Sequence, residues 1–403
     1  MSKSFWQSGH KPTLFSAFLY FDLSFMVWVL LGPLAVQIAA DLQLTAAQKG
    51  LMVATPVLAG ALLRIVMGVL VDQIQPKMAG LIGQVIVIAA LLAAWLHGIH
   101  NFQQTLMLGI ALGFAGASFA VALPLASRWY PPEHQGTALG IAGAGNSGTV
   151  FAALFAPGLA VLYGWNNVLG LALIPLVLVM LIYTVYAKDS PDPAPAKTLS
   201  QYLAILKDKD AWWFMFFYGV TFGGFVGLAS SLTIYFNDQY GLSPVVAGYF
   251  TAACVFAGSL ARPFGGFIAD RMGGIRTLLI MYAIAGVFLL AMSTAPASLY
   301  LTLMIVVIIM ATLGMGNGAV FQLVPQRFRK EIGIMTGLVG MAGGIGGFYL
   351  AASLGWCKQV TGDYQLGLAA FALLAVLAIV GLSSVKTRWR TTWGSAAITA
   401  AKV

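Results

Sequence analysis

The sequence predicts an all-α membrane protein with twelve transmembrane helices in two related halves of six. Three observations predict this fold class: an apolar composition, twelve apolar runs of membrane-spanning length, and a residue pattern that occurs twice. Of the 403 residues, 60% are hydrophobic and only 8% are charged. In a soluble domain, roughly a quarter of all residues are charged, and most of them lie on its surface. The chain therefore has too little polar surface to face water.

The apolar runs are continuous and about 20 residues long, the length of helix that crosses ~30 Å of hydrocarbon. Strands of a membrane barrel would instead alternate over about ten residues. The runs lie near 14–38, 49–71, 78–98, 104–127, 136–162, 166–187, 211–236, 245–269, 277–296, 298–326, 333–354 and 364–385. A polar stretch separates the sixth run from the seventh. We therefore predict an N-terminal half at 1–187, a cytoplasmic linker at 188–210, and a C-terminal half with a short cytoplasmic tail at 211–403.

The positive charges predict the orientation. With both termini in the cytoplasm, seventeen of the 21 Lys and Arg residues fall on the cytoplasmic side and two, Lys49 and Lys358, fall outside. This is the bias of the positive-inside rule. It also explains the net charge of +9 without a nucleic-acid partner. Two arginines remain, Arg64 and Arg262, and both lie inside apolar runs.

The second half of the chain repeats features of the first. Residues 59–64 match residues 257–262 at an offset of 198, and the match continues through Gly68 and Gly266 to Asp72 and Asp270, with six of fourteen positions identical. A parallel repeat of this kind relates the two halves by a pseudo-two-fold axis along the membrane normal. Transporters built this way hold their substrate near the midplane, between the halves.

The two arginines predict an anion site. Each lies about eight residues from a helix end, roughly 12 Å deep at ~1.5 Å per residue. A guanidinium stays protonated and costs roughly 2.5–3.5 kcal/mol at mid-membrane. Among the acids, only Asp22 is predicted to be embedded. The planar fork of arginine suits a planar oxyanion. The alternative is that each arginine snorkels, or pairs with a carbonyl or with Asp22.

The remaining candidates for the pocket are aromatic or polar. The rings predicted in the middle third of their helices are Phe25, Phe119, Tyr218 and Phe222; the alternative for each is ordinary packing. Asn146 interrupts a stripe of glycines at three- and four-residue spacing, which lets helices approach closely. Its amide offers both donors and an acceptor to an oxyanion.

Two stretches carry a resemblance to a known family. Residues 143–148 (Gly-Ala-Gly-Asn-Ser-Gly) and 340–348 (Gly-Met-Ala-Gly-Gly-Ile-Gly-Gly-Phe) resemble the two signature motifs of the nitrate/nitrite porter family, within the major facilitator superfamily. Gly-x-x-x-Asp at the ends of two helices resembles that superfamily's loop signature. The resemblance implies gating or structural roles for Asp72, Asp270, Arg271, Gly143, Gly145, Gly340 and Gly344.

The same resemblance implies the substrate-binding roles. Arg64 and Arg262 would clamp nitrate or nitrite, Asn146 would hydrogen-bond it, and Tyr218 would donate its hydroxyl. Phe119 and Phe222 would sandwich the anion, with added contact from the backbone near Gly343 and from Phe25. It also implies a monomer in the cell inner (plasma) membrane, with the lipid bilayer around it. No catalytic residue, metal or cofactor is expected.

The coupling mode and the anion stay open at this point. A nitrate/nitrite antiporter needs no proton carrier, whereas a proton symporter needs a titratable group, for which Asp22 is the candidate. Formate, cyanate or a small carboxylate are rival substrates, and a membrane nitrate sensor is the rival class. An enzyme is not expected, because the sequence has no Cys/His metal spacing, phosphate-binding loop or nucleophile constellation.

Overall fold

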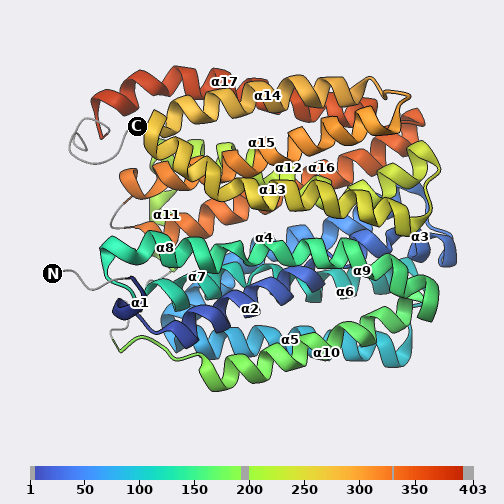
Figure 1. Cartoon of the computed structure of the whole chain (residues 1–403), viewed down its shortest axis with the longest axis horizontal. Helices are drawn as coiled ribbons and strands as arrows, with labels where there is room; N and C mark the ends of the chain where they lie inside the picture. Colours follow the sequence, from blue (N-terminus) through green and yellow to red (C-terminus); the bar gives the residue numbers. More distant parts are fainter. Residues whose placement is uncertain (1–4, 192–198, 329–330, 394–403) are drawn as a thin grey trace.

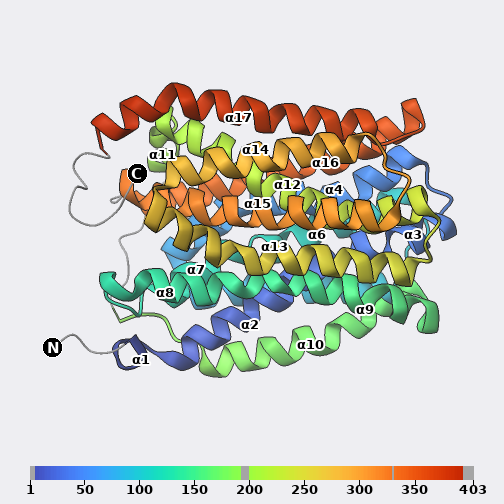
Figure 2. The same ribbon diagram turned by 45° about the horizontal axis from the view of Figure 1, so that its top comes forward.

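The structure is a computed structural model that describes residues 5–191, 199–328 and 331–393. Within these residues, twelve helical segments are long and apolar enough to cross a membrane, as predicted. They run side by side along the long axis of the molecule, and the first span begins at the same end at which the last span finishes (Figures 1 and 2). We call this the termini end, and the opposite one the far end. The segments are Lys11–Asp41, Ala46–Ile74, Pro76–His97, Phe102–Ser127, Ala138–Tyr163, Trp165–Tyr186, Lys209–Tyr240, Pro244–Met272, Gly274–Ser293, Leu299–Arg327, Ile332–Thr361 and Gln365–Thr391.

Three of the first six spans are interrupted. The first span is α2 (Lys11–Trp28) and α3 (Leu31–Asp41), and the fourth is α6 (Phe102–Gly116) and α7 (Phe119–Ser127). The fifth is α8 (Pro132–Gly143), a tighter 3₁₀ turn η1 (Ala144–Ser147) and α9 (Gly148–Tyr163). A 3₁₀ stretch inside a long helix often marks a functional hinge. The other N-terminal helices are α1 (Phe5–Ser8), α4 (Ala46–Ile74), α5 (Pro76–His97) and α10 (Trp165–Tyr186).

The corresponding spans of the second half are continuous. They are α12 (Lys209–Tyr240), α15 (Leu299–Arg327) and α16 (Ile332–Thr361), joined by α13 (Pro244–Met272), α14 (Gly274–Ser293) and α17 (Gln365–Thr391). The predicted linker contains a short helix, α11 (Leu199–Ile205), and residues 192–198 lie outside the described part. The exact division of the chain at 187 and 211 stays a prediction.

Three predicted helix ends were too early. Helix α12 continues to Tyr240 and α16 to Thr361, where Gly241 and Gly362 end them in the left-handed conformation, with φ of 65° and 83°. Glycine is the common residue at such C-terminal caps because it has no Cβ to clash. Helix α17 runs to Thr391 instead of 385, because Trp389 is buried in its last turns and both Trp389 and Arg388 donate to Asp210.

A buried carboxylate explains the long last helix and corrects a prediction. Asp210 is 3% exposed, so Asp22 is not the only embedded acid. The Asp210 carboxylate accepts from Arg327 Nε at 2.9 Å, from Trp389 Nε1 at 2.8 Å, and from Arg388. Paired charges with extra hydrogen bonds are the form in which a carboxylate tolerates burial. The carboxylate therefore ties the start of α12 to the ends of α15 and α17.

The two halves touch at the far end. Lys49 of α4 pairs with Asp238 of α12, with Nζ 3.1 Å from Oδ2, and the Tyr364 hydroxyl donates to the same oxygen at 2.8 Å. Burial, and then the Asp238 carboxylate, raise the pKa of the Tyr364 hydroxyl, so it remains a donor. Close by, a Cβ on Gly50 would lie 2.7 Å from the Cα of Gly355. Helices α4 and α16 are therefore in backbone contact here.

Candidate functional site

Arg64 is buried in α4 and reaches from one half of the molecule to the other. Its side chain is 1% exposed. Its Nε donates to the carbonyl oxygen of Gly116 at 3.2 Å, and its Nη1 donates to the carbonyl oxygen of Gly340, in α16, at 2.5 Å. Three rings surround the guanidinium, whose carbon lies 5.2–5.5 Å from the centroids of Trp28, Phe119 and Phe222. Its buried Nη2 has no hydrogen-bond partner.

Arg262 faces the same region from α13, but it is only partly buried. Its Nη2 lies 3.5 Å from the Tyr218 hydroxyl, and its guanidinium carbon lies 5.7 Å from the centroid of Phe321. Its buried Nη1 has no hydrogen-bond partner. The two guanidinium charges are close enough to repel each other. The surroundings of the two arginines therefore differ, because Arg64 bonds to backbone carbonyls on both sides whereas Arg262 contacts the Tyr218 hydroxyl.

No acid neutralises the pair in the part of the chain that the structure describes. The ion pairs there are Lys49–Asp238, Arg128–Asp72, Arg327–Asp208, Arg327–Asp210 and Arg388–Asp210. Asp22 accepts from the Ser147 hydroxyl at 2.7 Å and from the backbone of Gly148. Of the alternatives open for the arginines, pairing with a carbonyl is thus observed for Arg64. The carbonyl bonds use Nε and Nη1 of the Arg64 guanidinium and leave Nη2 for another acceptor.

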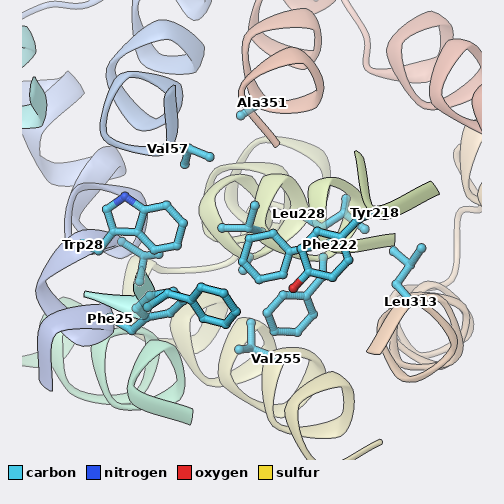
Figure 3. Close-up of a cluster of buried hydrophobic side chains, with 14 of the residues drawn as sticks. Phe25, Trp28, Val57, Tyr218, Phe222, Leu228, Val255, Leu313 and Ala351 are labelled. Carbon is cyan, nitrogen blue, oxygen red and sulfur yellow. The ribbon is translucent and has the colours of Figure 1, made fainter. Parts of the chain in front are cut away.

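Aromatic rings from both halves form the walls. Tyr218 and Phe222 of α12 lie parallel, with centroids 5.1 Å apart (Figure 3). Phe321 of α15 meets Tyr218 edge-on at 5.0 Å, and lies 6.2 Å from Phe119 of α7. Gly343 allows α16 to approach these rings, since a Cβ there would lie 2.7 Å from Tyr218 and 2.8 Å from Phe222. Phe119, Tyr218, Phe222 and Gly343 are therefore brought together as predicted, and Phe321 joins them. Their roles in binding the anion stay a prediction.

Two predicted contacts have other partners in the structure. Phe25 packs against Phe21 and Trp28, with centroids 4.3 and 4.6 Å away, and lies next to Trp28 (Figure 3). Asn146 is 2% exposed and lies in η1, where its carbonyl accepts from the Thr149 hydroxyl at 2.8 Å. A role for Asn146 in holding the anion stays a prediction.

The predicted structural glycines differ in their surroundings. A Cβ would lie 2.6 Å from Phe21 at Gly145, 3.3 Å from Arg64 Nη1 at Gly340, and 2.5 Å from Ala61 of α4 at Gly344. At Gly143 the nearest atom is 3.9 Å away, so close packing does not require a glycine there. Gly340 and Gly344 therefore lie where α16 of one half contacts α4 of the other.

The predicted gating residues lie at the termini end. Asp72 pairs with Arg128, with Oδ1 2.7 Å from Nη2. Asp270 is exposed at the end of α13, and the guanidinium of Arg271 lies 4.1 Å from the Phe267 ring. The Asp72–Arg128 pair joins α4 to the turn after α7. The role of these groups in gating stays a prediction.

Sequence reasoning did not name Trp28 or Phe321 as site residues, and it offered pairing with a carbonyl only as an alternative, without identifying Gly116 and Gly340. Phe321 had a usable signal: it lies four residues before Pro325, and Phe119 lies five residues before Pro124. Trp28 had none, because one aromatic residue in an apolar helix is ordinary. Backbone carbonyls carry no signal at all, since every residue has one.

Comparison with known proteins agrees with this fold. A family model described as Major Facilitator Superfamily matches residues 15–351. The chain is 32% identical to the nitrite extrusion protein of Bacillus subtilis (strain 168), over 88% of this chain and 89% of that protein. It is 30% identical to the probable nitrate/nitrite antiporter NarK1 of Thermus thermophilus, over 90% of this chain and 88% of that protein. A bacterial homolog of the human lysosomal transporter Spinster, in an inward-facing and occupied conformation, shares the fold: TM-score 0.72 and 18% identity, over 96% of this chain and 98% of that one.

Twelve spans in this fold define a multi-pass membrane transporter rather than an enzyme. The chain belongs to the major facilitator superfamily and, within it, to the nitrate/nitrite porter family whose motifs it resembles.

Proposed function

We propose that this chain carries nitrate, nitrite or both across the inner (plasma) membrane by alternating access. The anion is held between Arg64 and Arg262. Both termini and the linker face the cytoplasm, and the far end faces outward. The chain works as a monomer.

One observation carries this proposal: each arginine keeps one buried guanidinium nitrogen without a partner, Nη2 in Arg64 and Nη1 in Arg262. Buried polar groups in proteins are nearly always hydrogen-bonded, so such donors call for a bound acceptor. A small planar oxyanion offers acceptors to both forks at once. In the part of the chain that the structure describes, the groups around the two guanidinium groups are aromatic side chains and backbone carbonyls, which suits a small anion better than a larger organic substrate. The names of the two related proteins support nitrate and nitrite as the anions.

The charges suggest how binding is linked to movement. Without an anion, two like charges repel across the space between the halves, which opposes closure around an empty site. A bound anion neutralises part of this repulsion and bridges α4 to α13. The Tyr218 hydroxyl, 3.5 Å from Arg262 Nη2, supplies a further donor. The halves then rock about the occupied site.

Coupling follows one of two routes. In an exchanger, nitrite replaces nitrate on the same arginines and no proton is needed. In a symporter, a proton travels with nitrate and needs a carrier such as Asp22. The printed name of the Thermus relative favours exchange.

The proposal is tested by flux in proteoliposomes that contain the purified chain. Nitrate uptake is measured with nitrite inside, with no anion inside, and with an imposed proton gradient. We expect protein-dependent uptake of nitrate, stimulated by internal nitrite for an exchanger or by the proton gradient for a symporter. Counterflow with formate, cyanate and a small carboxylate runs in parallel. Flux of one of these, with none of nitrate or nitrite, would assign the site to another small anion.

Asp22→Asn tests the proton route. The carboxylate is buried and bonded to Ser147. Asparagine keeps the acceptor oxygen but cannot carry a proton. If Asp22 is the carrier, the variant loses the pH dependence of nitrate uptake, while exchange against nitrite remains. An unchanged pH profile removes Asp22 from the transport path.

The Lys49–Asp238 pair is expected to hold the far end closed. Both side chains are partly exposed, at 18% and 16%, so the pair is worth on the order of 1 kcal/mol. Lys49→Asp puts two carboxylates together and should slow uptake severalfold. Adding Asp238→Lys to that variant restores opposite charges and should recover most of the rate. Equal rates in the wild type and in Lys49→Asp would show that the pair has no part in closure.

A further inference from the structure

Trp28 occupies an unusual position at the end of α2. It is fully buried and is the last helical residue before the break between α2 and α3. Its indole Nε1 donates to the carbonyl oxygen of Pro56, in α4, at 2.7 Å. Buried indole groups usually find such a partner. The ring is thus held at both ends, by its own backbone and by α4.

Two glycines make the slot that the ring fills. A Cβ on Gly60 of α4 would lie 2.8 Å from the indole Nε1. A Cβ on Gly116 of α6 would overlap the ring. A real Cβ does not approach a ring atom so closely, so both positions require glycine while Trp28 is present. The ring therefore sets how closely α4 and α6 approach the end of α2.

The same slot borders Arg64. The guanidinium carbon lies 5.5 Å from the indole centroid, within the range of a cation–π contact. Gly116, which packs on the ring, also gives its carbonyl oxygen to Arg64 Nε. The indole thus contacts both the guanidinium and the residue that orients it. A displaced ring would alter both contacts.

We propose that Trp28 is a positioning residue for anion binding: it orients the Arg64 guanidinium so that its free Nη2 edge is presented to the anion. This inference rests on the proposed function of Arg64. Trp28 itself needs no contact with the anion, since it acts through the arginine. Its loss should weaken anion binding more than it slows the movement of the halves.

Trp28→Phe tests the proposal, with Trp389→Phe as the matched control. Phenylalanine loses the Nε1 donor and leaves part of the slot empty. Trp389 is also fully buried and also donates through Nε1, to Asp210 at 2.8 Å, but in the charge cluster of α12 and α17. Both variants should lose thermal stability. We expect Trp28→Phe to raise the KM and Kd for nitrate about tenfold with kcat nearly unchanged, because the smaller ring makes a weaker cation–π contact and loses the Nε1 bond that fixes it beside Arg64. Trp389→Phe should leave KM within about twofold.

A double variant separates orientation from simple filling of space. In Trp28→Leu with Gly116→Ala, the added methyl group occupies room that the smaller side chain vacates. The double variant should recover the stability lost in Trp28→Leu while its KM stays raised. A KM that returns to the wild-type value together with stability would reduce Trp28 to a space filler and overturn the proposal. So would a Trp28→Phe variant with lower stability and an unchanged KM.

The anion panel keeps the two hypotheses distinct. Kd is measured by calorimetry for nitrate, nitrite, formate and cyanate with the wild type and with Trp28→Phe. If the wild type binds formate but not nitrate, the proposed substrate is wrong, and the Trp28 comparison is made with formate. If the wild type binds none of them, both the clamp and the positioning role are refuted.

Discussion

Arg64→Lys and Arg262→Lys are each expected to lower nitrate uptake by at least about a hundredfold. A hydrogen bond to a charged group contributes about 1.5–3 kcal/mol, and a bidentate pair makes two of them. The lysine ammonium is a point charge on a flexible stem and cannot reproduce the planar fork. At position 64 it would also have to replace bonds to both the Gly116 and Gly340 carbonyls. We expect the larger loss there.

The measurement is initial uptake in proteoliposomes, matched for protein content, together with Kd for nitrate. Arg390→Lys is the control, because Arg390 is exposed in the last turn of α17 and far from the site along the chain. It should transport at the wild-type rate. Normal uptake by both the Arg64 and Arg262 variants would refute the clamp.

Gly148→Ala is expected to prevent stable folding of the first half. Gly148 begins α9, and a Cβ there would overlap the carbonyl oxygen of Asp22 and lie 3.0 Å from the backbone nitrogen of Met26. The obstructing atoms are backbone, so α2 and α9 must move apart. Overpacking of a well-packed core costs about 1–3 kcal/mol, and more when the backbone has to shift. The separation would also stretch the bond between Ser147 and Asp22.

Gly158→Ala gives the matched control in the same helix. Nothing lies within 4 Å of a Cβ at Gly158, so alanine has free space there. Its higher helix propensity should stabilise α9 by about 0.5–1 kcal/mol. The monodisperse yield in detergent and Tm should fall sharply for Gly148→Ala and stay level or rise for Gly158→Ala. Equal behaviour of the two variants would show that the contact of Gly148 with α2 is dispensable.

Properties that follow from neighbouring residues were predictable from the sequence. Composition and run length predicted the membrane class and the twelve spans, because each span has to be apolar over its own length to lie in hydrocarbon. The assignment of Lys and Arg residues to the two sides of the membrane then left Arg64 and Arg262 as the two cations that lie inside apolar runs. The repeat related them to each other. Helix ends were less accurate, since a polar last turn is stable in α17 only because Trp389 and Arg388 meet Asp210.

The tertiary structure alone decided what surrounds each arginine. Arg64 differs from Arg262 because carbonyl oxygens of Gly116 and Gly340 reach only the first, and a carbonyl has no signature in the sequence. Trp28 became significant only when two glycines on other helices closed around its ring. The sequence by itself thus determined that two arginines lie inside apolar spans, and it predicted an anion beside them, because a guanidinium buried without a partner is costly. How each guanidinium is oriented depends on which helix faces meet, and that is decided only when the helices pack.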